Sequence, residues 1–429
     1  MALNSWSNIG RAFTNKQYRT YQLGRIVFLS ATWMYRVAIG WLIWDLTHSA
    51  TWLGVFGLLD QAPAIFVMPL AGAQADRMDS LKLMRLTQAA LLVQSIVLAL
   101  LIELDLLTLL VLSIFTVVYG ITNAIQQPAS QAILPHLVQR GHHPTAYGLY
   151  SLMFNLSRFI GPMFAGPMID AWGTAPVILC NALGALWFMG CLTVMRNAVT
   201  IPIRKSDKSR HMLDEVREGF TYAMRHPGIG PAMVILTLLG FLPFTIDLLL
   251  PSLADGVYGE GAYGLSVMTS AAGLGAMCQA LTIARRGGVT GLTSYVVMAI
   301  LVGALAYLVL AFSGWFWLGA ACVFVISFTA SSVRVGSMTL LQYSVDPDMR
   351  GRVASFYGMV NHSVPALGAL LIGAGGDRFG IPLMMGVIGV LTLAIWAGAA
   401  SKRAVMAAAL EVDTQGAQAA ANTKERGAD

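Results

Sequence analysis

The sequence predicts an all-α membrane protein with about twelve transmembrane helices in two pseudo-symmetric six-helix bundles. Three observations support this fold class. The 429 residues are 56% hydrophobic and only 11% charged, unlike a soluble domain. Apolar runs long enough to cross a bilayer as a helix, roughly 20 residues each, recur along the whole chain. One long polar segment divides these runs into six and six.

The first bundle is predicted within residues 21–195, after an N-terminal segment of residues 1–20. Backbone groups inside lipid need hydrogen-bond partners within the chain, so each apolar run is expected to be a helix. The first run is too long for the core of a signal peptide and is predicted to remain as a span. The six spans are Tyr21–Leu46, Thr51–Gln74, Leu83–Ile102, Leu106–Ile125, Ala146–Ile169 and Pro176–Met195.

The second bundle is predicted within residues 231–401, and the alanine-rich tail of residues 402–429 is expected to be disordered. Its six spans are Pro231–Leu253, Gly264–Ile283, Leu292–Phe312, Trp315–Leu340, Ser355–Ala374 and Pro382–Ala400.

The central loop, residues 196–230, carries four apolar side chains at helical spacing: Leu213, Val216, Phe220 and Met224. This spacing predicts an amphipathic helix. Two placements remain open, because the helix can lie on the membrane surface or pack on neighbouring loops.

Basic residues gather in the loops of one side, and this asymmetry predicts that both termini are cytoplasmic. The net charge of +6 follows from this bias, so no nucleic acid partner is expected. The four cysteines lie in apolar runs without metal-ligand spacing, so neither a metal nor a cofactor is expected. The basic positions are Arg11, Lys16, Arg19, Arg77, Lys82, Arg85, Arg140, the cluster of residues 196–225, Arg285, Arg286, Arg350, Arg352, Lys402 and Arg403.

The two halves match when the sequence is shifted by 207 residues (377 minus 170). The shift relates Gly161 to Gly368, Gly166 to Gly373, Asp170 to Asp377 and Gly173 to Gly380. A repeat of six-helix halves implies a pseudo-two-fold axis along the membrane normal, with a binding site between the halves near mid-membrane. This organisation favours a transporter over a membrane enzyme.

Residues 72–77, GAQADR, resemble the loop signature of the major facilitator superfamily, which consists of a glycine, three intervening residues, then Asp-Arg and further basic residues. The matching positions are Gly72, Asp76 and Arg77. The family's next glycine and basic pair are replaced here by residues 79–81, DSL. The stretches MYRVAIGWLIWDLTHSATWLG, FNLSRFIGP and MRGRVASFYGMV are similar to the subgroup of the enterobactin exporter and related bacterial efflux proteins.

This resemblance, which extends from Asn15 to about Arg403, implies a secondary active transporter. It implies proton-coupled export of a small organic molecule, such as a drug-like compound, siderophore or metabolite, by a monomer in the bacterial inner membrane. Import or facilitated passage of a small solute, or lipid flipping on the same scaffold, are the alternatives. No cofactor and no catalytic residues are implied.

The fifth predicted span carries small residues where the superfamily's antiporters have a glycine-rich pattern. Small residues let helices approach closely in lipid, and proline allows a bend. The resemblance therefore implies a close-packed, kinked contact between the halves; a packing motif unrelated to transport direction is the alternative. The motif positions are Gly148, Ser157, Gly161, Pro162, Ala165 and Gly166.

Five ionisable residues stand out inside the predicted spans, where lipid exposure is costly: Arg36, Asp60, Arg158, Asp247 and Arg334. The resemblance places Arg36, Asp247 and Arg334 on helices that line the superfamily's cavity. Asp60 and Arg158 are expected to pair with each other or to gate closure. Asp60 is also the favoured proton-coupling group, because a carboxylate in a dry site can accept and release a proton.

The fourth span lacks the arginine that is usual in such antiporters and offers Asn123 and Gln127 instead, and the shift aligns Gln127 with Arg334. Five large side chains are candidates for the cavity wall, although helix packing also explains them. They are Trp33, Trp41, Trp44, Tyr119 and Met338.

Overall fold

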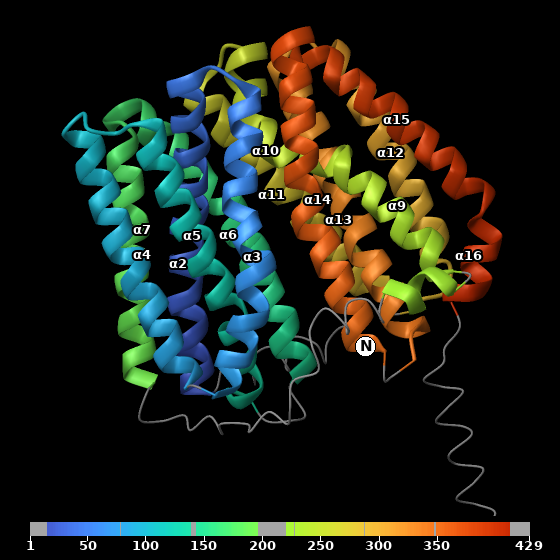
Figure 1. Ribbon diagram of the computed structural model, residues 1–429, viewed down its shortest axis with the longest axis horizontal. Helices are drawn as coiled ribbons and strands as arrows, with labels where there is room; N and C mark the ends of the chain where they lie inside the picture. Colours follow the sequence, from blue (N-terminus) through green and yellow to red (C-terminus); the bar gives the residue numbers. More distant parts are fainter. Residues whose placement is uncertain are drawn as a thin grey trace, which may run out of the picture.

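The protein is described here by a computed structural model of residues 15–77, 79–138, 143–195, 220–226, 228–286, 288–346 and 349–411. These residues form helices and turns without any β-strand (Figure 1). Eight of the described helices are long and apolar enough to cross a membrane, and a bent pair makes a ninth. The predicted all-α membrane fold is confirmed.

The first bundle consists of six long helices that occupy one side of the molecule (Figure 1). Side-chain caps begin three of them: Asn15, Asp79 and Thr108 accept hydrogen bonds from first-turn N–H groups that have no partner within the helix. The helices are α2 (Lys16–Thr47), α3 (Ala50–Arg77), α4 (Ser80–Glu103), α5 (Leu109–Ile133), α6 (His143–Trp172) and α7 (Thr174–Met195).

The second bundle repeats this arrangement, but its first span is broken. The segment Ile229–Phe241 meets Pro243–Val257 at a bend of 48°, since proline lacks the N–H that would continue a helix. The elements of this span are α9 (Ile229–Phe241), η3 (Pro243–Thr245), α10 (Ile246–Pro251) and η4 (Ser252–Val257). The other helices are α11 (Gly261–Arg286), α12 (Leu292–Phe312), α13 (Phe316–Ser344), α14 (Arg350–Phe379) and α15 (Ile381–Ser401).

The bundles pack together most closely at the end that carries the α2–α3 turn, at the top of Figure 1. There the buried apolar side chains of the first bundle are continuous with Leu253, Tyr307 and Met385 of the second. The rest of the second bundle has its own apolar cluster, which includes Met233 and Leu340. The two largest contacts between bundles are α6 against α11 and α3 against α14.

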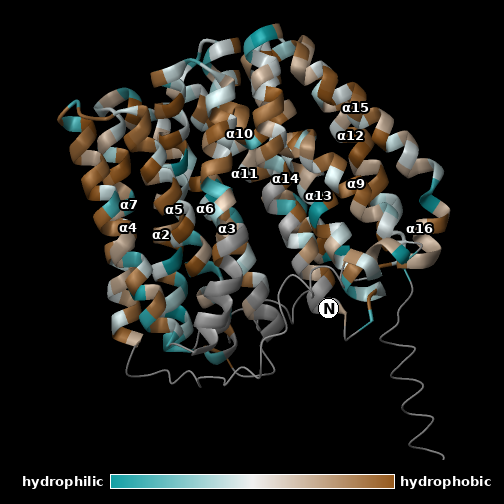
Figure 2. Cartoon of the chain, viewed as in Figure 1, coloured by the Kyte–Doolittle hydropathy of each residue, from teal (hydrophilic) through white to brown (hydrophobic). Residues whose placement is uncertain are grey.

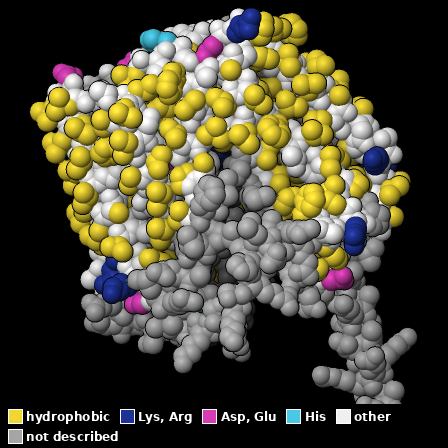
Figure 3. All heavy atoms as spheres, in the orientation of Figure 1, with side chains coloured by type: hydrophobic (Ala, Val, Ile, Leu, Met, Phe, Trp, Pro, Cys, Tyr) yellow, Lys and Arg dark blue, Asp and Glu magenta, His cyan; other side chains and the backbone are white. Residues whose placement is uncertain are grey.

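The outer surface is apolar, as expected of a protein surrounded by lipid. Leu110 is 72% exposed and Phe312 is 88% exposed, and in water such a surface would promote association. Apolar residues run along the outer helices (Figure 2), and yellow side chains cover most of the described part of one face (Figure 3). The polar residues described next lie inside this apolar outer surface.

The expectation of a disordered tail is wrong for its first part. Residues Arg403–Leu410 form α16, with Met406 and Leu410 buried. The Glu411 carboxylate accepts hydrogen bonds from the backbone N–H groups of Gly291 (2.6 Å) and Thr293 (2.9 Å). Alanine favours helix, and the two buried side chains dock that helix on the bundle. Residues 412–429 lie outside the described residues.

The central loop is described only near its end. Residues 220–225 are helical, the Phe220 ring packs edge-on against Phe356 of α14, and the Tyr222 hydroxyl donates to Asp346 (3.0 Å). This part of the predicted amphipathic helix therefore packs on the second bundle. Leu213 and Val216 lie outside the described residues.

Candidate functional site

A cavity of about 290 Å³ lies between the two bundles. Its walls come from α2, α3 and α5 of the first bundle and from η3, α10, α11, α13 and α14 of the second. Four of the five ionisable residues singled out in the sequence line it: Arg36, Asp60, Asp247 and Arg334. Arg158 is joined to the cavity through Asp247.

Arg36 of α2 and Asp60 of α3 face each other on the first-bundle wall. Their closest nitrogen and oxygen atoms are 3.5 Å apart. Gln61 also donates to the Asp60 carboxylate (3.2 Å). The Arg36 guanidinium carbon lies 5.6 Å from the ring centre of Trp33 and 5.8 Å from that of Tyr119. This cation is held by one carboxylate and two aromatic rings.

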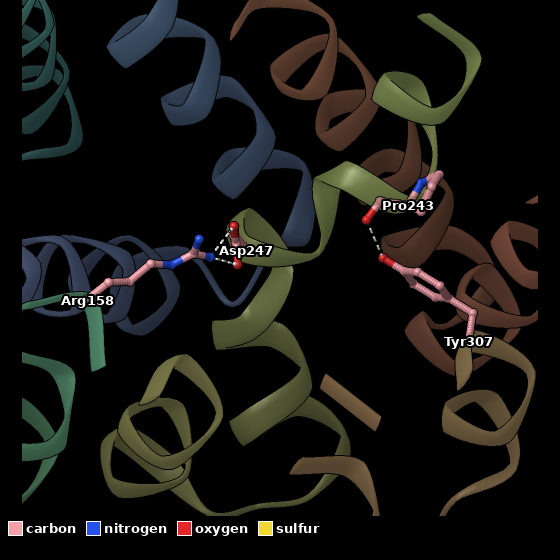
Figure 4. A network of polar contacts seen from close by, with 4 residues as sticks. All are labelled: Arg158, Pro243, Asp247 and Tyr307. Atoms are coloured by element: carbon pink, nitrogen blue, oxygen red, sulfur yellow. Dashed lines mark hydrogen bonds and ion pairs between the residues drawn. The ribbon is translucent and has the colours of Figure 1, made fainter. Parts of the chain in front are cut away.

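Arg158 of α6 forms an ion pair with Asp247 across the boundary between the bundles (Figure 4). One guanidinium nitrogen donates to both carboxylate oxygens, at 2.8 and 2.7 Å. The expected pairing of Arg158 with Asp60 is therefore wrong. Asp247 belongs to the second bundle, and sequence position alone could not place it beside α6.

The break in the seventh span brings Asp247 to this position. Asp247 lies in the first turn of α10, directly after η3. Two carbonyl groups at the break accept side-chain hydrogen bonds: Pro243 from the Tyr307 hydroxyl (2.6 Å; Figure 4), and Leu242 from the Thr245 hydroxyl (2.6 Å). Buried carbonyls need such partners, so the break is a supported feature of the fold.

Arg334 of α13 lines the cavity and has no carboxylate within 4.0 Å among the described residues. Its guanidinium carbon lies 4.3 Å from the ring centre of Phe244, and its buried Nε has no hydrogen-bond partner among the described residues. The ion pairs found within 4.0 Å in the described part of the chain involve only the other two arginines. Asn361 of α14 lines the same cavity, and its buried Oδ1 also lacks a partner in the described part of the chain.

The polar residues predicted on the fourth span do not line this cavity. The Asn123 side chain donates to the Tyr119 carbonyl one turn earlier (3.2 Å), and Gln127 is exposed. Trp33 and Tyr119 do form part of the wall, as predicted. Trp41, Trp44 and Met338 lie elsewhere, and the Trp44 indole N–H donates to Asp255 (2.8 Å).

The small-residue motif of α6 makes two kinds of contact. Gly166 lies against Ser266 and Ala262 of α11, in the other bundle. Gly161 instead lies against the Ser30 carbonyl of α2, in its own bundle, so the prediction of a contact between halves holds at Gly166 and is wrong at Gly161.

The remaining motif positions divide in a similar way. Ser157 donates to the Ile26 carbonyl (3.3 Å), within the first bundle. Pro162 and Ala165 are buried. Gly148 is exposed, with open space around it. The close packing is therefore concentrated in the second half of α6.

The loop signature falls in the last turns of α3, which ends at Arg77. The side chains of Gly72, Asp76 and Arg77 lie outside the described residues. Their role in gating stays a prediction.

Two polar features escaped the sequence reasoning. The Asp377 carboxylate accepts hydrogen bonds from both hydroxyl and N–H groups at the start of α3, from Ser49, Ala50 and Thr51, at 2.5 to 3.0 Å. The repeat had marked Asp377, but nothing local indicated its partner helix. Arg25 is only 4% exposed and donates to the Tyr150 carbonyl (3.0 Å), away from the cavity.

Comparison with known proteins gives consistent results. A family described as transmembrane secretion effector matches residues 11–424. The staphyloferrin A transporter of Staphylococcus aureus is 25% identical over 86% of this chain and 92% of its own length. The enterobactin exporter EntS of Shigella boydii is 26% identical over 92% of this chain and 96% of its own length.

The fold resembles that of a solved transporter. The crystal structure of the nucleoside transporter NupG superimposes with a TM-score of 0.69, covering 90% of this chain and 98% of that one at 11% identity. At this identity the likeness concerns the fold alone.

Proposed function

Because this chain belongs to the transmembrane secretion effector family of the major facilitator superfamily, we propose that it exports a small organic molecule by proton-coupled alternating access. The family and the relatives are small-molecule transporters, not enzymes. Export, rather than import, is favoured by the relative named as an exporter and by the antiporter-like motif of α6.

The observation that carries this proposal is the cavity with walls from both bundles. Alternating access requires a site that each bundle reaches, so that rocking one against the other exposes it to either side. Aromatic and apolar side chains make up much of the wall, and a few charged groups orient a bound molecule. A small organic substrate suits such a lining.

Asp60 is the proposed proton carrier. Its side chain is 16% exposed, whereas that of Asp247 is 37% exposed. Asp247 is also bonded to Arg158 through both carboxylate oxygens. Protonation of Asp60 would remove the attraction that holds Arg36 at a distance of 3.5 Å and would free that cation inside the cavity.

The proposal includes a gate at each end of the cavity. Gly72, Asp76 and Arg77 are assigned to one gate by resemblance to the family's loop signature. Close contacts such as Gly166 against α11 support the rocking of one bundle on the other. The protein is proposed to act as a monomer in the bacterial inner membrane, with both termini in the cytoplasm.

Transport by the purified protein in proteoliposomes tests the function. A pH gradient should drive uptake of compounds from a panel of siderophores, antibiotics and other toxic molecules into vesicles of inside-out orientation. Movement independent of the gradient would instead indicate a facilitator, and movement of labelled phospholipid alone would indicate a flippase.

Cysteine labelling tests the orientation. Probes at Ser206 and Gly259 should react from opposite sides of the membrane, with Ser206 on the cytoplasmic side. Labelling of both positions from outside intact cells would contradict the proposed topology.

A further inference from the structure

We infer that the transported molecule carries a negatively charged group, and that Arg334 binds this group directly. The inference rests on the proposed function, because it specifies the substrate of the same cavity. It depends on the balance of charge around the cavity, on the surroundings of Arg334, and on the unpartnered polar group of Asn361.

The charges around the cavity do not cancel. Among the described residues, three arginines and two aspartates surround it, which gives a formal charge of three minus two, or +1. Both aspartates already have an arginine within ion-pair distance, Asp60 at 3.5 Å and Asp247 at 2.7 Å. Among the three arginines, Arg334 is the one without a carboxylate within 4.0 Å in the described part of the chain.

Arg334 is held in position for a ligand. One face of its guanidinium lies over the Phe244 ring, and its own carbonyl accepts a hydrogen bond from the Tyr357 hydroxyl (2.6 Å). Its buried Nε–H has no acceptor among the residues that the structure describes. A guanidinium is a planar fork that binds carboxylate or phosphate through two parallel hydrogen bonds. Because a charged group that is partly shielded from water needs a partner, an anionic ligand in the cavity would supply the missing counter-ion.

The neighbouring wall indicates the rest of the ligand. Asn361 offers an amide whose buried oxygen is unpartnered, and an amide can both donate and accept hydrogen bonds. Phe56, Tyr119 and Phe244 add aromatic surface to the same cavity. We therefore expect an anionic group attached to an aromatic or apolar body that also carries a hydroxyl or amide.

Three matched probes test the inference: naphthoate, naphthamide and naphthylmethylamine, which share a ring system and differ in charge. Binding to the purified wild-type protein is followed by quenching of tryptophan fluorescence, since Trp33 lines the cavity. Naphthoate should bind at least about tenfold more tightly than naphthamide, the gain typical of a charge-assisted hydrogen bond, and the amine should bind most weakly.

Variants then assign the preference to one residue. Arg334→Gln should bind naphthoate and naphthamide equally, whereas Arg334→Lys should keep part of the preference because it retains the charge. Arg285→Gln, which removes an exposed arginine outside the cavity, should behave as wild type. The inference is overturned if wild type binds none of the probes, prefers the amide or amine, or keeps its preference in Arg334→Gln.

Failure of this inference is distinguishable from failure of the proposed function. Proteoliposomes that move neutral or cationic panel compounds, with no Arg334-dependent preference for naphthoate, would retain the function and reject the anionic substrate. Proteoliposomes that move nothing, while Arg334-dependent naphthoate binding persists, would reject the function and retain the anion site.

Discussion

The α3–α14 contact and the α6–α11 contact are the two places where the bundles pack most extensively, and they are related by the internal repeat. Gly373 of α14 lies against the Ala50 carbonyl of α3, as its counterpart Gly166 of α6 lies against Ala262 of α11. Gly380 and Gly173, just beyond α14 and α6, share a positive φ, 92° and 80°. The backbone geometry of the two contacts is therefore alike.

Their polar interactions differ. At the α3–α14 contact, Asp377 accepts hydrogen bonds from the first residues of α3. Its counterpart Asp170 is exposed and has no hydrogen bond in the described part of the chain. The α6–α11 side instead has the Arg158–Asp247 ion pair beside the cavity. The hydrogen bonds of Asp377 stabilise the α3–α14 contact at its end, whereas the Arg158–Asp247 ion pair stabilises the α6–α11 side next to the candidate site.

This difference indicates that the two contacts have different roles. Small residues permit close approach at both contacts, and a larger side chain at Gly166 or Gly373 would meet the backbone of the facing helix. Polar groups can change without disturbing that approach. We expect the Asp377 cap to resist opening of its end of the protein, and the cavity charges to respond to substrate and protons.

The largest expected effect comes from placing a large side chain where a glycine lets two helices approach closely, a feature that both contacts have. Gly166→Leu and Gly373→Leu should each reduce transport to background while the protein still inserts in the membrane, because overpacking a tight contact costs about 1–3 kcal/mol or more. Vesicle transport and membrane abundance are the measurements. Gly148→Leu, at an exposed site with open space, is the control and should transport normally; full activity of Gly166→Leu would show that the close approach is dispensable.

The next largest effect is expected at the cavity carboxylates, and it should distinguish Asp60 of α3 from Asp247, which is paired with α6. Asp60→Asn should eliminate substrate-dependent proton release in inverted vesicles while substrate binding partly survives, because asparagine keeps the shape but carries no proton. Asp247→Asn should retain proton release and weaken the link between the bundles. Unchanged proton release in Asp60→Asn, with loss in Asp247→Asn, would transfer the coupling role to the α6–α11 side.

A smaller effect is expected from the cap. Asp377→Asn should favour opening of its end by about 1–2 kcal/mol, or roughly 5–30-fold in the equilibrium, because hydrogen bonds to a charged group are lost. The labelling rate of Val257→Cys, which lies in the depression beside Asp377, measures this opening. The background should lack the native cysteines Cys180, Cys191, Cys278 and Cys322. Slower or unchanged labelling would contradict the proposed role of the Asp377 cap in resisting opening.

The smallest effect is expected at the counterpart of the cap. Asp170→Asn should change thermal stability by no more than about 0.5 kcal/mol and leave the Val257→Cys labelling rate within about twofold, as is usual for surface positions without partners. An effect as large as that of Asp377→Asn would remove the difference between the two contacts.

Much of the fold was predictable from the sequence because the bilayer imposes local rules. The length and low charge of each span can be recognised from a local stretch of sequence, and so can the polar segment after the sixth span. The repeat of Gly166 and Gly373 also identified the fifth and eleventh spans as copies, but it did not indicate which helices they pack against. The α16 helix was missed because its alanines suggested disorder, while the burial of Met406 and Leu410 depends on distant partners.

The sequence by itself determined that the protein is helical, lies in a membrane, consists of two related halves and buries a small set of charges. The tertiary structure alone decided which charges meet: Arg36 with Asp60, Arg158 with Asp247, and Arg334 with no carboxylate within 4.0 Å among the described residues. The reason is physical. Hydropathy is a property of each segment, whereas ion pairing falls off within a few ångströms and depends on how helices from different bundles are rotated and bent.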